Sequence, residues 1–288
     1  MSGYGDGWWT SADGLRLHYR DYGGGEGRPP ILCIPGLTRN ARDFEGVASR
    51  LAGQWRVICV DLRGRGESEA AKDPATYNPL VYLQDVQALI AALGADRLVV
   101  FGTSLGGLVA MLLAAVDKAR LAGVLLNDVG PVLEEAGLDH IRAYVGKSQN
   151  WPTWVHAARA LCEAQRERYP DWELDDWLVF AKRVCRLTPQ GRIVLDYDMR
   201  IAEPLKVPAP AVDLWPTFMA LSGVPALLVR GELSDLLSDA SAARMASELP
   251  DLEVAVVPRV GHAPTLEEPA AAAAIDRLLV RVLRPTAA

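Results

Sequence analysis

The stretch that decides the fold is Val99–Ala110, which reads VVFGTSLGGLVA. A short apolar run at 98–101 leads into GTSLGG (102–107), and an apolar stretch with helical character continues to Val116. This order predicts a strand, a sharp turn and a helix, with Ser104 at the apex of the turn. Such a turn is tight enough to need small residues two positions before and two positions after the serine, and Gly102 and Gly106 meet that demand. The stretch therefore predicts a nucleophile elbow, although an ordinary strand-to-helix turn remains the other interpretation of this motif taken alone.

Apolar runs around this stretch set the fold class. They occupy residues 30–34, 56–60, 98–101, 121–126, 225–230 and 252–257, and helical patterns separate most of them. Strands that alternate with helices at this rhythm predict an α/β fold with a mostly parallel central sheet and helices on both faces. Residues 8–22 alternate apolar and polar around Asp13-Gly14, which is typical of an antiparallel hairpin at the edge of a sheet.

The rhythm changes between Pro131 and Val212. No β-branched strand run occurs there, and helical stretches at 133–145, 154–168 and 174–186 are separated by prolines. We therefore predict a core formed by residues 1–130 and 213–288 and an all-helical insertion, a cap, formed by residues 131–212. The insertion is rich in tryptophan and leucine, so we expect it to form a lid over an apolar pocket.

Composition restricts the partners. The chain has 288 residues, of which 50% are hydrophobic and 23% are charged, and its formal net charge is −6. No basic patch stands out that could neutralise phosphates, so a nucleic-acid partner is not expected. Leu98–Val116 carries no charge, but GTSLGG divides it into a strand and a helix, so no membrane span is expected. We expect a cytoplasmic protein with a small-molecule substrate, because no export signal is visible, and a homodimer is possible.

Two further residues complete a candidate catalytic set. Asp235 and His262 each follow a predicted parallel strand, which places them at the same carboxyl edge of the sheet as Ser104. A serine hydroxyl is a weak nucleophile at neutral pH, so His262 would take its proton while Asp235 orients and stabilises the imidazole. Asp128 also ends a strand and is the alternative acid; Asp235 is preferred because its strand is nearer to the histidine along the chain.

The backbone next to Ser104 offers candidate oxyanion donors. Leu37 follows the apolar run that ends in Pro35-Gly36, so its N–H could join the N–H of Leu105 in stabilising an oxyanion. Arg39 and Arg42 follow closely, and either could reach a substrate carboxylate, although solvated charges at a helix start are the simpler interpretation. No HExxH or CxxC pattern occurs, so we expect neither a metal nor another cofactor.

These motifs together resemble the α/β-hydrolase fold family over essentially the whole chain. The resemblance rests on GTSLGG as the elbow, PGL at the oxyanion strand, DLRGRGES after the next strand, GELSD for the acid and GHAPTLEEP around the histidine. The chain order Ser104, Asp235, His262 is also the order of that family's triad. The resemblance implies a serine-dependent hydrolase with a helical cap inserted after the sixth strand. Relatives that use an aspartate nucleophile are excluded by Ser104.

The resemblance implies an esterase most directly. We expect hydrolysis of carboxylic esters of small to medium, uncharged acyl groups through an acyl-enzyme, because no basic cluster in 131–212 marks a carboxylate clamp. Enol-lactonases and C–C hydrolases of ring-cleavage products share these motifs and are the alternative. A cofactor-free perhydrolase or a non-catalytic ligand receptor is a more distant alternative.

Overall fold

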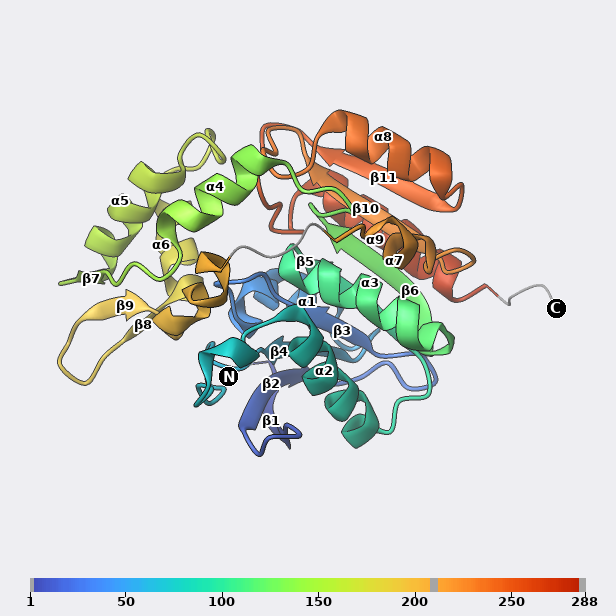
Figure 1. The fold of residues 1–288 in the computed structure, drawn as a ribbon, viewed down its shortest axis with the longest axis horizontal. Coiled ribbons are helices and arrows are strands. Elements are labelled where there is room, and N and C mark those ends of the chain that lie inside the picture. The colour runs from blue at the N-terminus through green and yellow to red at the C-terminus, as the bar shows by residue number, and fades with distance from the viewer. Residues whose placement is uncertain (1–2, 208–211, 285–288) are drawn as a thin grey trace.

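The computed structural model describes residues 3–207 and 212–284, and its centre is an eight-stranded sheet (Figure 1). The strands, in order across the sheet, are β1 (Gly5–Thr10), β2 (Arg16–Tyr22), β4 (Val57–Asp61), β3 (Ile31–Ile34), β5 (Leu98–Thr103), β6 (Leu121–Asn127), β10 (Ala226–Gly231) and β11 (Leu252–Val257). The six strands from β4 to β11 pair in parallel, whereas β1 and β2 form an antiparallel edge. The predicted sheet is therefore confirmed, including its edge hairpin.

Helices cover both faces of this sheet, as predicted. One face packs against α2 (Pro79–Leu93), α3 (Leu105–Asp117), α7 (Trp215–Met219) and α8 (Asp239–Glu248), and the other packs against α1 (Glu45–Leu51) and α9 (Pro269–Val282). Short 3₁₀ turns lie at Ala41–Phe44, Pro74–Thr76, Lys118–Arg120, Met199–Ala202 and Pro204–Lys206. Every residue of β3, β4, β5, β6 and β10 is buried, because a parallel sheet covered on both faces leaves its central strands no contact with water.

The insertion, residues 131–212, leaves the sheet after β6 and lies to one side of it, at the left of Figure 1. It contains the three predicted helices, α4 (Glu135–Tyr144), α5 (Trp154–Gln165) and α6 (Leu174–Val184). It also contains a small antiparallel sheet formed by β7 (Asn150–Trp151), β9 (Ile193–Leu195) and β8 (Cys185–Leu187). The expectation of an all-helical insertion was therefore wrong, because strands of two or three residues are too short to show an alternating pattern.

The limits of the insertion fall in the connections on either side of it. Pro131 lies between β6 and α4, and the chain rejoins the sheet at β10 after the short helix α7. Residues 208–211, next to the predicted limit at Val212, lie outside the described residues. The division into a core and a cap stays a prediction. Within the described ranges, no helix combines the length and the apolar character that crossing a membrane would require.

Candidate active site

Ser104 lies at the sharp turn between β5 and α3, where the sequence analysis places it. Its backbone has φ 51° and ψ −114°, a strained conformation for a residue with a side chain. A Cβ atom at Gly102 would lie 2.5 Å from the backbone of Gly106, and one at Gly106 would lie 2.0 Å from the carbonyl oxygen of Ile34. Only glycine fits at these two positions, so the sequence enforces the turn that exposes the Ser104 hydroxyl.

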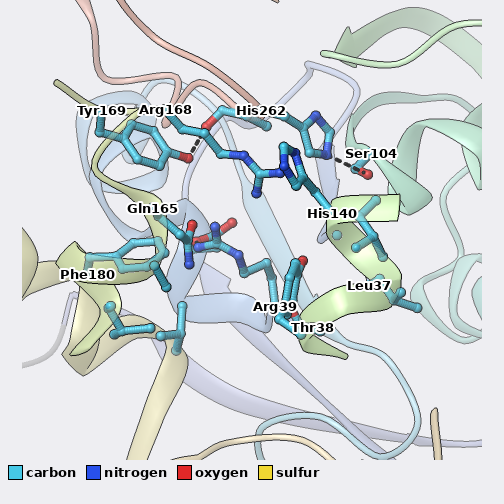
Figure 2. A pocket seen from close by; sticks show the side chains of 18 of the residues that line it. Leu37, Thr38, Arg39, Ser104, His140, Gln165, Arg168, Tyr169, Phe180 and His262 are labelled. Atoms are coloured by element: carbon cyan, nitrogen blue, oxygen red, sulfur yellow. Dashed lines mark hydrogen bonds and ion pairs between the residues drawn. The ribbon is translucent and has the colours of Figure 1, made fainter. Parts of the chain in front are cut away.

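His262 approaches Ser104 from the loop that follows β11. Its Nε2 lies 3.0 Å from Ser104 Oγ, and its Nδ1 lies 2.7 Å from Asp128 Oδ2 (Figure 2 shows the contact with Ser104). The imidazole is thus held between a hydroxyl and a carboxylate. With Nδ1 donating to Asp128, Nε2 is left as an acceptor for the Ser104 proton. The structure brings together the predicted pair Ser104 and His262.

The carboxylate beside His262 belongs to Asp128 and not to Asp235. Asp128 directly follows β6, its side chain is fully buried, and its carboxylate accepts hydrogen bonds from Gly231 N at 2.9 Å and from Ser234 Oγ at 2.6 Å. Strand β6 is the neighbour of β5 in the sheet, so its end lies next to Ser104. The preference for Asp235 as the partner of His262 is therefore corrected to the alternative acid.

Asp235 joins the core to the insertion instead. Its carboxylate pairs with His140 on α4 and with Arg168, whose Nη2 lies 3.0 Å away. Burial opposes the charge of Asp235, but the hydrogen bonds from these two groups outweigh burial and lower the pKa of the carboxyl. Asp235 lies four residues beyond the end of β10, and by that point the chain has turned toward the insertion, where Leu236 O accepts from Glu134 N.

The two predicted oxyanion donors flank Ser104. Leu105 is the first residue of α3, and the first N–H groups of a helix have no acceptor within that helix. Leu37 follows Gly36, where a Cβ atom would lie only 3.7 Å from the Cβ of Ser104. The carbonyl oxygen of Leu37 accepts from Arg65 Nε at 2.9 Å. These positions suit a pair of N–H donors on either side of a carbonyl oxygen bound at Ser104.

Sequence reasoning missed the groups that support this arrangement. Ser234 and Gly231, which hold Asp128, lie in the same GELSD region that was interpreted as the source of the acid. Arg65, which holds Leu37, lies in the DLRGRGES motif, to which the sequence analysis assigned no role in the site. These supporting residues lie within motifs that the sequence analysis identified. The sequence alone does not show which residue of a neighbouring strand or loop each of them contacts.

A cavity of about 720 Å³ opens above Ser104 and His262. The core contributes Leu37, Thr38 and Arg39 to its wall, and the insertion contributes residues of α4, α5, α6 and the loop between α5 and α6. The tryptophans of the insertion are not among the described residues that line it; Trp172 and Trp177 pack against each other inside the insertion instead. The wall is consequently more polar than the apolar pocket that we expected.

Arg39 and Arg42, which follow Leu37, point in different directions in the structure. Arg39 lies along the cavity wall, with Nη1 3.0 Å from Asp43 Oδ1 and its guanidinium 4.4 Å from the centre of the Phe180 ring. Arg42 points elsewhere and pairs with Asp196 of the insertion.

Among residues 3–207 and 212–284, no group of three or more histidine, cysteine, aspartate or glutamate side chains is arranged to hold a metal ion.

Comparisons with known proteins agree with this fold. The model of the alpha/beta hydrolase family matches residues 31–275. The chain is 35% identical over 263 residues to a 3-hydroxybutyrate-oligomer hydrolase of Cupriavidus necator, covering 88% of this chain and 89% of that protein. It is 29% identical to a 2-(acetamidomethylene)succinate hydrolase of Mesorhizobium japonicum, covering 86% and 85%. The crystal structure of an alpha/beta hydrolase from Novosphingobium aromaticivorans superposes with a TM-score of 0.95 at 57% identity, covering 98% and 99%.

Proposed function

This chain belongs to the alpha/beta hydrolase family, and we propose that it is a serine hydrolase that cleaves carboxylic esters of small to medium acyl groups through an acyl-enzyme intermediate. The observation that carries the proposal is the hydrogen-bonded series of Ser104, His262 and Asp128 at the wall of the 720 Å³ cavity. The Cupriavidus necator relative is named for the hydrolysis of 3-hydroxybutyrate oligomers, and hydroxy acids oligomerise through ester bonds, which supports an ester substrate.

The proposed reaction has two halves. Ser104 Oγ attacks the ester carbonyl while His262 Nε2 takes the hydroxyl proton, and Asp128 fixes the tautomer and stabilises the imidazolium. The proton then passes from His262 to the departing alcohol, which leaves the acyl group esterified to Ser104. In the second half, His262 deprotonates a water molecule that attacks this ester, and the acid and the free Ser104 are released. Each proton that His262 takes is returned within the same half, so the cycle needs no cofactor.

Two further parts of the proposal concern charge and shape. The negative charge that develops on the carbonyl oxygen is bound by the backbone N–H groups of Leu37 and Leu105, as their positions beside Ser104 support. The insertion, residues 131–212, acts as the cap that limits the length of the acyl group, since its helices supply much of the cavity wall.

The expectation that the acyl group is uncharged is not carried into the proposal. It depended on the premise that no cluster of basic residues in 131–212 marks a carboxylate clamp. Arg166, Arg168 and Arg183 of the insertion line the cavity, so that premise was wrong. Periodicity places these arginines on helices and loops but does not say which way they face.

A second candidate is the hydrolysis of an acidic product of ring cleavage, either an enol lactone or a C–C bond. The observation that favours it is the same row of arginines along the cavity, because such products carry carboxylates. The nucleophile, base and oxyanion donors would be the same residues in both cases. The two candidates therefore differ in the bond that is placed beside Ser104, and substrate preference separates them.

The test is a panel of 4-nitrophenyl esters of acetate, butyrate and octanoate, run beside an enol lactone and a vinylogous diketone acid. We expect the short esters to give a higher kcat/KM than the octanoate, because the insertion supplies much of the cavity wall and would limit the length of the acyl group. Turnover of the diketone acid or the lactone without ester turnover would replace the proposal with the second candidate. A pure, folded protein that hydrolyses no member of the panel would contradict both candidates.

A further inference from the structure

The wall of the cavity carries charged side chains in pairs. Besides the pair of Arg39 and Asp43, Arg168 pairs with Asp235 across the seam between the insertion and the core. All four side chains are less than a quarter exposed. Removing such charges from water is costly unless each is compensated, so pairing explains how Arg39 and Arg168 can be largely buried in this wall. The pairs also fix the direction in which each guanidinium points.

Arg39 has hydrogen-bonding capacity that its partner does not use. A guanidinium carries five N–H donors, and the bond to Asp43 engages Nη1. The Phe180 ring supports the flat face of the guanidinium, which leaves the edges of the group to make hydrogen bonds. Burial opposes the charge, but Asp43 and the hydroxyl of Tyr169 outweigh it and raise the pKa of Arg39, so the side chain stays cationic. In Figure 2 its guanidinium reaches into the cavity toward Gln165.

The opposite side of the cavity also carries side chains with N–H donors, around the carboxylate of Asp235. Arg168 comes from the loop between α5 and α6, and His140 comes from α4; both contact Asp235. Figure 2 shows the Arg168 guanidinium and the His140 imidazole next to each other, on the side of the space opposite the backbone of Arg39. A small anion in this space would therefore meet hydrogen-bond donors from the core and from the insertion at the same time.

The turn that carries Arg39 lies beside the reacting serine. Arg39 is two residues beyond Leu37, so their Cα atoms are within about 7 Å of each other. The Arg39 backbone N–H bonds to Gly36 O at 3.1 Å, which holds this turn beside Ser104. Ser104 and Arg39 line the same cavity, so one ligand can bind to Ser104 through its carbonyl group and to the Arg39 guanidinium through its other end.

We propose that Arg39, assisted from the insertion by Arg168, binds a free carboxylate of the substrate, and that the preferred substrates are esters that carry such a carboxylate. This inference rests on the proposed ester hydrolysis and adds the class of substrate. The carboxylate accepts charge-assisted hydrogen bonds from the edge of Arg39 that Asp43 leaves free. It can belong to the acid half of the ester or to the alcohol half, and the experiment distinguishes these two sources.

The experiment compares matched esters that differ in one charge. Mono-4-nitrophenyl glutarate against 4-nitrophenyl valerate tests the acid half, and 3-(butyryloxy)propanoate against 3-(butyryloxy)propanamide tests the alcohol half. We expect the wild-type kcat/KM to favour the carboxylate member of at least one pair by about tenfold to hundredfold, the range for hydrogen bonds to a charged group. In Arg39→Gln that ratio should fall toward one. Arg142→Gln is the matched control, because Arg142 is an exposed arginine on α4 that pairs with Glu135 and Asp139; it should keep the wild-type ratio.

A second measurement does not depend on the folding of a variant. Glutarate and glutaramide are compared as competitive inhibitors of the wild-type protein, and we expect glutarate to inhibit at about tenfold lower concentration. Equal inhibition by the two compounds would overturn the inference, as would a wild-type ratio near one in both ester pairs or an unchanged ratio in Arg39→Gln. In all three cases, hydrolysis of the neutral esters that depends on Ser104 would leave the proposed function standing.

Failure of the proposed function has a different signature. If the wild-type protein hydrolyses neither member of either pair, ester hydrolysis is wrong, and the subsite is then judged by calorimetry with glutarate alone. Binding to the wild-type protein that weakens by about tenfold or more in Arg39→Gln would support the subsite. Absent binding, or equal binding to both proteins, would overturn it.

Discussion

His262 and His18 each place Nδ1 against a buried carboxylate, but the groups that face their Nε2 atoms differ. His262 Nδ1 lies 2.7 Å from a buried carboxylate, that of Asp128, and His18 Nδ1 lies 2.7 Å from another, that of Asp61. The second nitrogen distinguishes them. His262 Nε2 faces Ser104 Oγ at 3.0 Å, whereas His18 Nε2 faces the carboxylate of Asp6 at 2.9 Å.

This difference decides what each imidazole can do. Between two carboxylates, both nitrogens of His18 must donate, which is the hydrogen-bonding pattern of a protonated ring. Burial of His18 opposes that charge, but Asp61 and Asp6 outweigh burial and raise the pKa of the imidazole. With both nitrogens facing carboxylates, the His18 ring presents no nitrogen to a hydroxyl group from which it could take a proton. A histidine beside a buried aspartate is therefore not sufficient evidence of a catalytic base; the group on its other nitrogen has to be a nucleophile.

The two aspartates are also supported in similar ways. Asp128 is supported by Gly231 and Ser234, and Asp61 is similarly supported by the backbone N–H groups of Ala41 and Glu67. A smaller cavity of about 250 Å³ opens at His18, but its described lining contains no serine, threonine, cysteine or lysine that could act as a nucleophile. Four substitutions test whether the site of His262 and the site of His18 differ in this way.

Replacing Ser104 by alanine removes the hydroxyl group that distinguishes the site of His262 from the site of His18. We expect kcat/KM for 4-nitrophenyl butyrate to fall by about 10⁴-fold or more, because binding and the oxyanion donors alone provide little of the rate. The thermal unfolding midpoint should stay close to that of the wild type, which serves as the folding control. Turnover within tenfold of the wild type in a pure preparation would remove Ser104 from the mechanism.

The second change concerns the carboxylate. Asp128→Asn should lower kcat by about 10³-fold to 10⁴-fold, because the new amide can donate to Nδ1 and leave the proton on Nε2, where it blocks acceptance from Ser104. Asp235→Asn is the matched control, since Asp235 contacts His140 and Arg168. It should change kcat for a neutral ester by less than about tenfold. The reverse ranking of the two variants would return the acid to Asp235.

A smaller effect is expected where Asp128 loses support but keeps its charge. Ser234→Ala removes the hydroxyl that donates to Asp128 Oδ2 at 2.6 Å, and we expect kcat to fall by about threefold to tenfold with little change in KM. Ser234→Thr restores a hydroxyl and should recover most of the activity. Ser247→Ala, at a serine of α8 that contacts only the Arg244 carbonyl among the described hydrogen bonds, is the control. An equal loss in Ser234→Thr and Ser234→Ala would contradict the assignment.

The smallest effect on turnover is expected at the other histidine. His18→Gln should leave kcat within about twofold and lower the free energy of unfolding by about 1 to 3 kcal/mol at pH 6, since it breaks a buried charged hydrogen bond to Asp61. The pKa of His18 is raised in the folded state, so its stabilisation is fully present below the ordinary value of 6.5 and is lost as the pH rises through the folded value.

Unfolding at a series of pH values measures this dependence. The difference in unfolding midpoint between the wild type and His18→Gln should be largest near pH 6 and narrow toward pH 9. A difference that widens with rising pH would mean that His18 is neutral in the folded protein. A loss of turnover beyond tenfold in His18→Gln would show that the two sites are not independent.

Much of the fold could be predicted because local chemistry decides it. Helix α2 begins after Asn78, whose side chain accepts from the N–H groups of Leu80 and Val81, and it ends at Gly94 with φ 61°. The elbow could be predicted for the same reason, since Gly102 and Gly106 are required by contacts within a few residues of Ser104 or with the adjacent strand β3. The two- and three-residue strands of the insertion could not, because so short a segment carries no period.

The alternation of strands and helices, the elbow at Ser104 and the loop that carries His262 can all be inferred from the order of the residues. The pairing of His262 with Asp128 rather than Asp235, and the position of Arg39 rather than Arg42 at the cavity, depend on how the chain packs. The members of each pair look alike in the sequence, because both aspartates follow a predicted strand and both arginines follow the same PGL motif. Hydrogen bonds and ion pairs act over about 3 Å, so the choice depends on which strands are neighbours and where each loop turns, and chain order does not contain that information.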